Sequence, residues 1–150
     1  MLPISVITLS TGRNAEWLQT AIDSVSHQTM PPAQHIIIKD FDRKMTIAQA
    51  YNKALRKVTQ PYFCILDDDD VLDPSALEML MAKMREMKKK DPKVFRIASF
   101  QVLINETGVP LAFTSMACQG LMKHQVVRNL GGYPNVPNGP DGRPTAIPTD

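Results

Sequence analysis

Apolar residues in the first half of the chain form short continuous runs that alternate with stretches of helical spacing. The runs at residues 4–9, 35–39 and 62–66 are β-rich and each precedes a polar segment, which predicts three strands. Apolar residues that recur every three or four positions predict an amphipathic helix after each strand. The expected buried positions are Trp17, Leu18, Ala21, Ile22 and Val25 in the first helix, Ile47, Ala50, Tyr51, Ala54, Leu55 and Val58 in the second, and Leu77, Met79, Leu80, Met81, Met84 and Met87 in the third.

Capping residues indicate where these helices begin. Asn14, Thr46 and Asp73 suit N-cap positions, and Pro74 suits the first turn of the third helix. Because parallel strands need crossover connections, three strands that alternate with three helices predict an α/β fold. We expect a mostly parallel sheet with helices on both faces.

The pattern changes in the second half of the chain. Residues 94–104 and 111–115 are predicted to be strands that a turn of sequence NETG joins into a β-hairpin. A short helix is expected over residues 123–130, and closely spaced prolines follow Gly131. We therefore expect one domain over residues 1–133 and a proline-rich loop or tail over residues 134–150.

Composition narrows the classes of function. The chain has 150 residues, 43% of them hydrophobic, which suffices for the core of one domain. Its 17 basic and 15 acidic residues leave a net charge of +2, so no overall field favours nucleic acid or an anionic membrane. Without an apolar run of membrane-spanning length or a signal-peptide pattern, we expect a cytoplasmic protein with no transmembrane segment.

Four consecutive aspartates, residues 67–70, directly follow the third expected strand. Adjacent carboxylates repel one another and are costly to desolvate unless a cation neutralises them. Capping of the next helix needs only Asp73, and the cluster lacks the alternating ligands and the glycine of an EF-hand loop. One or two carboxylates that hold Mn²⁺ or Mg²⁺ together with water and substrate phosphate suit the cluster better. The pattern therefore favours a nucleotide diphosphate ligand.

Two other polar segments also follow expected strands. The loop at residues 10–13 comes after the first strand, and Asp40 comes after the second. In open parallel sheets, ligands bind outside the carboxyl ends of the strands. We expect both segments to share one site with the aspartate cluster.

The segments ISVITLSTGRNAEWLQTAIDSVSHQT, HIIIKD and AQAYNKALRKVTQPYFCILDDDDVLDPSALE together resemble the family 2 glycosyltransferases. The likeness runs from about residue 4 to residue 80 and returns more weakly at QGLMKHQVVRNLGGYP. It implies a GT-A type, Rossmann-like fold and a site whose residues match the family's motifs. By this resemblance the nucleotide is bound by Leu9, Thr11, Arg13, Asp40, Asp67 and Asp68, and the metal ion by Asp69.

The resemblance also implies a reaction. A sugar would move from a nucleotide-diphosphate sugar, with a UDP-sugar the expected donor, to a hydroxyl of an unknown glycan, lipid or protein acceptor, with inversion. The bound Mn²⁺ or Mg²⁺ would neutralise the departing diphosphate, and Asp150 matches the position of the catalytic base. The sequence departs from the family at Phe41, Tyr51 and Ala54, where a second acidic residue, an arginine and a glycine are common.

Two alternatives stand beside this hypothesis. Members of the family continue past the base into an acceptor-binding helix, so the chain is either a transferase or a nucleotide-sugar-binding fragment or subunit without activity of its own. A nucleotidyltransferase would be expected to carry a glycine-rich basic loop after its first strand. The sequence STGRN supplies only one glycine and one arginine there.

Overall fold

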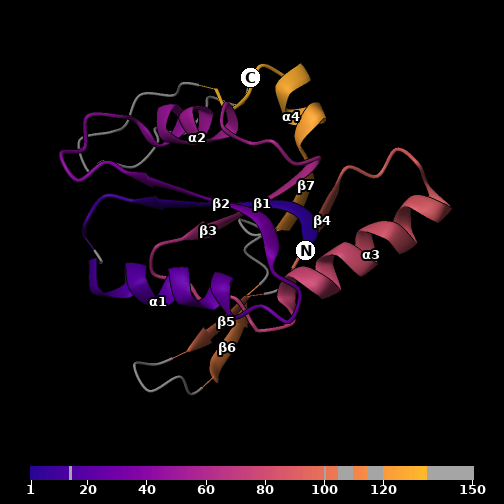
Figure 1. Cartoon of the computed structure of the whole chain (residues 1–150), viewed down its shortest axis with the longest axis horizontal. Helices are drawn as coiled ribbons and strands as arrows, with labels where there is room; N and C mark the ends of the chain where they lie inside the picture. The colour runs from indigo at the N-terminus through magenta and orange to yellow at the C-terminus, as the bar shows by residue number, and fades with distance from the viewer. Residues whose placement is uncertain (14, 100, 105–109, 115–119, 135–150) are drawn as a thin grey trace.

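A computed structural model describes residues 1–13, 15–99, 101–104, 110–114 and 120–134 (Figure 1). Its strands are β1 (Leu2–Ser10), β2 (Pro32–Lys39), β3 (Tyr62–Asp67), β4 (Arg96–Ala98), β5 (Gln101–Ile104), β6 (Pro110–Thr114) and β7 (Gly120–Lys123). Its helices are α1 (Ala15–Ser26), α2 (Ile47–Leu55), α3 (Ala76–Lys90) and α4 (His124–Asn129). Among these described helices, none has the length and apolar character that crossing a membrane requires.

The central sheet has the strand order β2-β1-β3-β7-β4. Strand β1 pairs in parallel with both β2 and β3, whereas β7 is antiparallel to both β3 and β4. Four of the five strands therefore point the same way, which confirms the mostly parallel sheet predicted from the alternating pattern. Strands β5 and β6 pair with each other as a separate two-stranded sheet.

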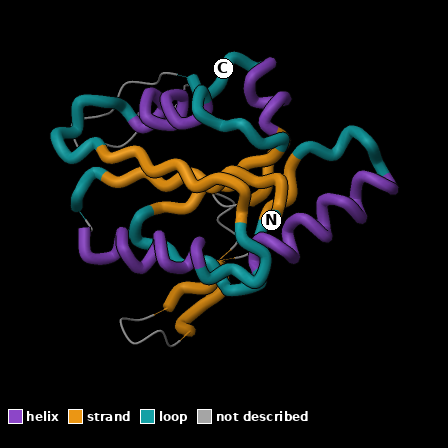
Figure 2. Tube along the Cα trace, in the orientation of Figure 1, coloured by secondary structure: helices purple, strands orange, loops and turns teal. Residues whose placement is uncertain are grey.

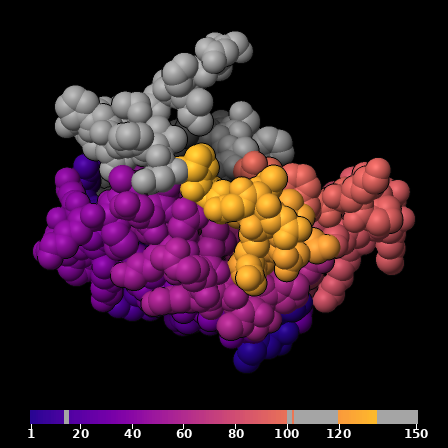
Figure 3. Space-filling model, turned by 90° about the horizontal axis from the view of Figure 1, so that it is seen from above, coloured from indigo at the N-terminus to yellow at the C-terminus, as the bar shows by residue number. Residues whose placement is uncertain are grey.

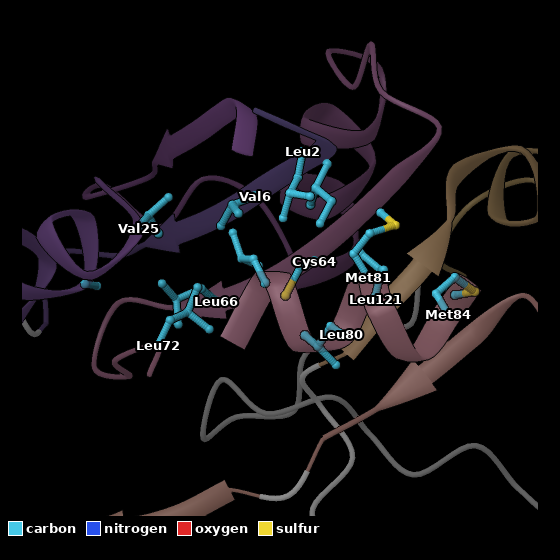
Figure 4. Close-up of a cluster of buried hydrophobic side chains, with 13 residues drawn as sticks. Leu2, Val6, Val25, Cys64, Leu66, Leu72, Leu80, Met81, Met84 and Leu121 are labelled. Carbon is cyan, nitrogen blue, oxygen red and sulfur yellow. The ribbon is translucent and has the colours of Figure 1, made fainter. Parts of the chain in front are cut away.

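The sheet lies between two layers of helices. Helices α1 and α3 cover one face, and α2 and α4 cover the other (Figures 1 and 2). Successive residues of a strand point to opposite faces, so β3 sends Cys64 and Leu66 toward α1 and α3, and Phe63 and Ile65 toward α2. Figure 4 shows the cluster on the α1 and α3 side, where leucine, valine and methionine side chains enclose Cys64.

The start of α2 agrees with the sequence prediction. The Thr46 hydroxyl accepts a hydrogen bond from the Gln49 backbone N–H, and the Gln49 side chain accepts one from the Thr46 N–H. This reciprocal capping box satisfies two backbone donors that the helix leaves without partners.

The start of α3 differs from the prediction. The helix begins at Ala76 after Ser75 and not at Pro74, because the Asp73 carboxylate accepts hydrogen bonds from the backbone N–H and hydroxyl of Ser75 in a preceding turn. The predicted cap Asn14 lies outside the described residues.

Three predicted core residues are exposed, among them Ile47 at the first position of α2, which is 43% exposed. Trp17 is 40% exposed and Met79 is 66% exposed. Met79 is two residues from both Leu77 and Met81, which are buried. A two-residue step turns the side chain by about 200° around a helix, so Met79 points away from the core.

The second half of the chain departs most from the prediction. Residues 94–104 do not form one strand: β4 joins the central sheet, whereas β5 forms the hairpin with β6. The sequence analysis also missed β7, which lies between β3 and β4. Gly120 is required there because a Cβ atom would overlap the backbone oxygen of Ile97. The NETG turn lies outside the described residues, as does nearly all of the proline-rich segment.

Candidate nucleotide-binding edge

Strand register brings the three predicted segments to one edge of the sheet. Leu9 of β1 lies opposite Asp67, the last residue of β3, and opposite Ile38 of β2. One residue further, the backbone N–H of Asp40 donates a hydrogen bond to the Ser10 oxygen, at 2.8 Å. The loop after β1, Asp40 and the aspartate cluster therefore meet at the carboxyl ends of β1, β2 and β3, as predicted.

Asp67 contacts helix α2. The Tyr51 hydroxyl donates a hydrogen bond to Asp67 Oδ1 at 3.3 Å. Asp67 lies two residues beyond Ile65 and so continues the row of side chains on the α2 face. Burial raises the pKa of Asp67 above its usual value, and the negative charges of Asp69 and Asp68 raise it further, while the Tyr51 hydrogen bond lowers it.

The next two aspartates differ in their surroundings. Asp69 is exposed, whereas Asp68 Oδ2 is buried and has no hydrogen-bond partner within the described part of the chain. A buried carboxylate oxygen without a donor is costly, and a bound cation would relieve that cost. The described residues contain no group of three acidic, histidine or cysteine side chains able to hold a metal ion. The Asp68 and Asp69 carboxylates could contribute one or two oxygen ligands to Mn²⁺ or Mg²⁺, which commonly completes its coordination with water and phosphate.

Asp40 organises the loop after β2. Its Oδ1 accepts a hydrogen bond from the Lys44 N–H at 3.0 Å, and its Oδ2 accepts one from the Met45 N–H at 2.9 Å. Both oxygens therefore stabilise the loop, and an open hollow of about 300 Å³ beside them is lined by Lys39, Asp40, Phe41 and Asp42.

Phe41 forms the wall between this hollow and the β1 loop. The loop turns at Gly12, whose φ of 77° favours glycine, and a Cβ atom there would lie 3.0 Å from Phe41 Cδ1. The exposed Phe41 ring is also 5.9 Å from the Lys39 ammonium. An aromatic side chain thus stands where the family commonly has an acidic one.

The other predicted site residues occupy the same edge with different exposure. Leu9 is half-buried, and Thr11 and Arg13 are exposed in the loop that follows β1. The predicted base Asp150 lies outside the described residues.

The structure adds one connection that the sequence analysis missed. Asn52 Nδ2 donates a hydrogen bond to the Tyr133 oxygen, and the Tyr133 N–H donates one to Asn52 Oδ1, both at 2.9 Å. The rings of Tyr51 and Tyr133 lie 5.2 Å apart at an angle of 37°. Figure 3 views the molecule from the side of α2 and α4. The yellow segment that contains α4 lies against the magenta surface that includes α2. Gly132, directly before Tyr133, was the available signal, since a Cβ atom there would overlap Asn52 Oδ1.

A family comparison matches half of the chain. The model of the family described as "Glycosyl transferase family 2" matches residues 33–108. That range contains Asp40 and the whole aspartate cluster. A search of curated proteins gave no match.

Solved structures share the fold. The mannosyltransferase PcManGT from Pyrobaculum calidifontis, in complex with GDP-Man and Mn²⁺, is 16% identical with a TM-score of 0.61, and the match covers 89% of this chain and 48% of that one. TarS 1–349 from S. aureus, in complex with UDP, is 12% identical with a TM-score of 0.59, and the match covers 87% of this chain and 49% of that one. A CMP:2-keto-3-deoxy-manno-octonic acid synthetase complexed with CTP is 11% identical with a TM-score of 0.51, and the match covers 85% of this chain and 77% of that one. The chain thus has a GT-A fold and spans about half the length of the PcManGT and TarS 1–349 chains.

Proposed function

Because the chain belongs to glycosyl transferase family 2, we propose that it binds a nucleotide-diphosphate sugar at the carboxyl edge of its sheet and serves sugar transfer to an acceptor hydroxyl. The observation that carries the proposal is the register that sets Leu9 beside Asp67. This register joins the β1 loop, Asp40 and the aspartate cluster at one edge of the sheet, the kind of edge that binds nucleotides in open α/β sheets.

Each residue of the edge has a role in the proposal. Leu9, Thr11, Arg13 and Asp40 contact the base and ribose. Asp67 and Asp68 lie by the ribose and the first phosphate. We propose a UDP-sugar as the donor; UDP and GDP-Man are the ligands of two structural neighbours.

Asp69 is proposed as the metal-binding residue. Its exposed carboxylate and the buried Asp68 Oδ2 supply the oxygen ligands that Mn²⁺ and Mg²⁺ prefer. When bound, the cation supplies a Lewis acid that offsets the negative charge of the departing diphosphate. The neighbour that holds GDP-Man together with Mn²⁺ supports the use of a divalent cation, while Asp69 as its ligand is the proposal.

The acceptor side of the reaction rests on the family resemblance. Asp150 is proposed as the base that removes the proton of the attacking acceptor hydroxyl, with inversion at the sugar carbon. The alternative is a unit that binds the donor but depends on further sequence for catalysis. Because the chain matches only about half the length of the two neighbours, both the transferase and the binding unit need to be tested.

Calorimetric titration tests the donor site directly. UDP, GDP, CDP and dTDP are titrated with and without Mn²⁺ into the chain, into Asp69→Asn and into a control, Asp91→Asn. The control removes a carboxylate charge beyond the end of α3 but keeps an oxygen that can accept the Lys93 N–H. We expect metal-dependent binding of one nucleotide that Asp69→Asn abolishes and Asp91→Asn retains.

Two outcomes would contradict the proposal. If no nucleotide binds in the presence of metal, the proposed donor site is wrong. If Asp69→Asn binds the nucleotide as tightly as the unchanged chain, the assignment of Asp69 to the metal is wrong. A transferase assay on a chain extended beyond residue 150 then distinguishes an active enzyme from a unit that only binds the donor. Persistent activity of the extended Asp150→Asn variant would reject that residue as the base.

A further inference from the structure

Tyr51 connects helix α2 to the end of strand β3. It is half-buried against the cluster that includes Ile38 and Ile65, and its hydroxyl donates to Asp67 Oδ1 at 3.3 Å. This distance exceeds the roughly 2.7 Å typical of hydroxyl–oxygen hydrogen bonds.

The Tyr133 ring packs against the Tyr51 ring. Its ring lies 5.2 Å from the Tyr51 ring, a separation typical of favourable aromatic pairs. Its backbone is held by the two hydrogen bonds to Asn52, the residue next to Tyr51. The close approach of the two segments requires Gly132, where a Cβ atom would overlap Asn52 Oδ1. The segment after α4 is thus fixed on α2 at the point from which Tyr51 reaches Asp67.

We infer that Tyr51 is a positioning residue for donor binding: its hydroxyl orients the Asp67 carboxylate at the nucleotide edge, and the Tyr133 ring holds Tyr51 in place. The inference rests on the proposed function, because Asp67 is assigned there to the nucleotide. It adds that residues 131–134, remote from the aspartate cluster in sequence, contribute to nucleotide affinity. Since coupling between sites is reciprocal, a bound nucleotide also stabilises the packing of residues 131–134 against α2.

A double-mutant cycle on nucleotide affinity tests the inference. The affinities of the chain, Tyr51→Phe, Asp67→Ala and the double variant are measured for the nucleoside diphosphate that binds most tightly in the presence of Mn²⁺. We expect Tyr51→Phe to weaken binding by roughly three- to tenfold, the range that one hydrogen bond supplies. The same change in the Asp67→Ala background should have little further effect, because the oxygen that accepts the Tyr51 hydrogen bond is already gone.

Two further variants separate positioning from general stability. Tyr133→Leu removes the packing ring and should weaken binding, whereas Tyr62→Phe removes a hydroxyl at the opposite end of β3 and should leave affinity unchanged. Thermal unfolding of every variant shows that the titrated protein is folded.

The possible results discriminate between the inference and its premise. If the chain binds a nucleotide and Tyr51→Phe binds it equally well, or if the two changes are additive, the positioning role is wrong while the donor site stands. If the chain binds no nucleotide, the proposed function and the inference are both overturned.

Discussion

Asn52 and Tyr133 exchange two hydrogen bonds across 81 residues of sequence. The side-chain amide of Asn52 donates to the Tyr133 oxygen and accepts from the Tyr133 N–H, each at 2.9 Å. The amide thereby pairs with a backbone unit in the manner of a neighbouring strand, and it ties α2 to the segment that follows α4. Both backbone groups of Tyr133 depend on this one side chain.

The Asn52 amide is expected to stabilise the fold. Asn52→Ala leaves a half-buried N–H and carbonyl of Tyr133 without their partners, so the free energy of unfolding should fall by about 1–3 kcal/mol. Urea unfolding followed by circular dichroism measures the change. Asn129→Ala, at an exposed position of α4, serves as the control and should change stability by less than about 0.5 kcal/mol. Equal effects of the two variants would rule out the stabilising role.

Gly131 and Gly132 form a matched pair for a second prediction. Both adopt positive φ, 83° and 85°, but a Cβ atom at Gly131 meets nothing within 4 Å, whereas one at Gly132 overlaps Asn52 Oδ1. Gly131→Ala should cost about 1 kcal/mol from the left-handed backbone alone. Gly132→Ala should cost clearly more because the Asn52 contact must also open. The same unfolding measurement compares them, and a smaller loss for Gly132→Ala would contradict the geometry.

Gln28 joins α1 to the start of α3 through three hydrogen bonds. Its amide donates to the carbonyl oxygens of Asp73 and Ser24, and its Oε1 accepts from the Leu77 N–H at 3.0 Å. The side chain is only 5% exposed, so Gln28→Ala should lower the free energy of unfolding by about 2–4 kcal/mol through unsatisfied buried groups. The exposed Gln19 gives the control Gln19→Ala, expected to change stability by less than about 0.5 kcal/mol. A similar small change at Gln28 would show that water replaces these hydrogen bonds.

Stability should fall in mildly acidic solution because of the half-buried His35 and the buried His124. Burial lowers the pKa of His35, and burial together with the nearby Arg128 charge lowers the pKa of His124 despite its hydrogen bond to the Leu55 oxygen. Below the ordinary value of about 6.5, the unfolded chain therefore binds more protons than the folded one, and the free energy of unfolding decreases as pH falls.

Urea unfolding at pH 7.5 and pH 5.5 measures this loss. The double variant His35→Gln/His124→Gln should lose less stability between the two pH values than the unchanged chain does. An equal loss in both proteins would assign the acid sensitivity to other groups.

The amino-acid sequence by itself determined the elements of the first half and the edge that carries the site. Continuous apolar runs and helical spacing are local properties, so they predicted β1, β2, β3 and the three helices between and after them. The rule that the carboxyl ends of parallel strands share one edge also places Asp40 near the aspartate cluster. The Thr46 cap was predictable for the same reason, because a capping box spans only four residues.

Tertiary structure decided what depends on contacts between distant segments. Strands β4 and β7 have three and four residues, too few for a visible period, and they form because each pairs with a neighbour already in the sheet. The hydrogen bonds from Tyr51 to Asp67 and from Asn52 to Tyr133 join residues that no local pattern relates. Periodicity fixes which face of an element is apolar, but the partner of a polar side chain is set only when the packed layers bring the two residues within hydrogen-bonding distance.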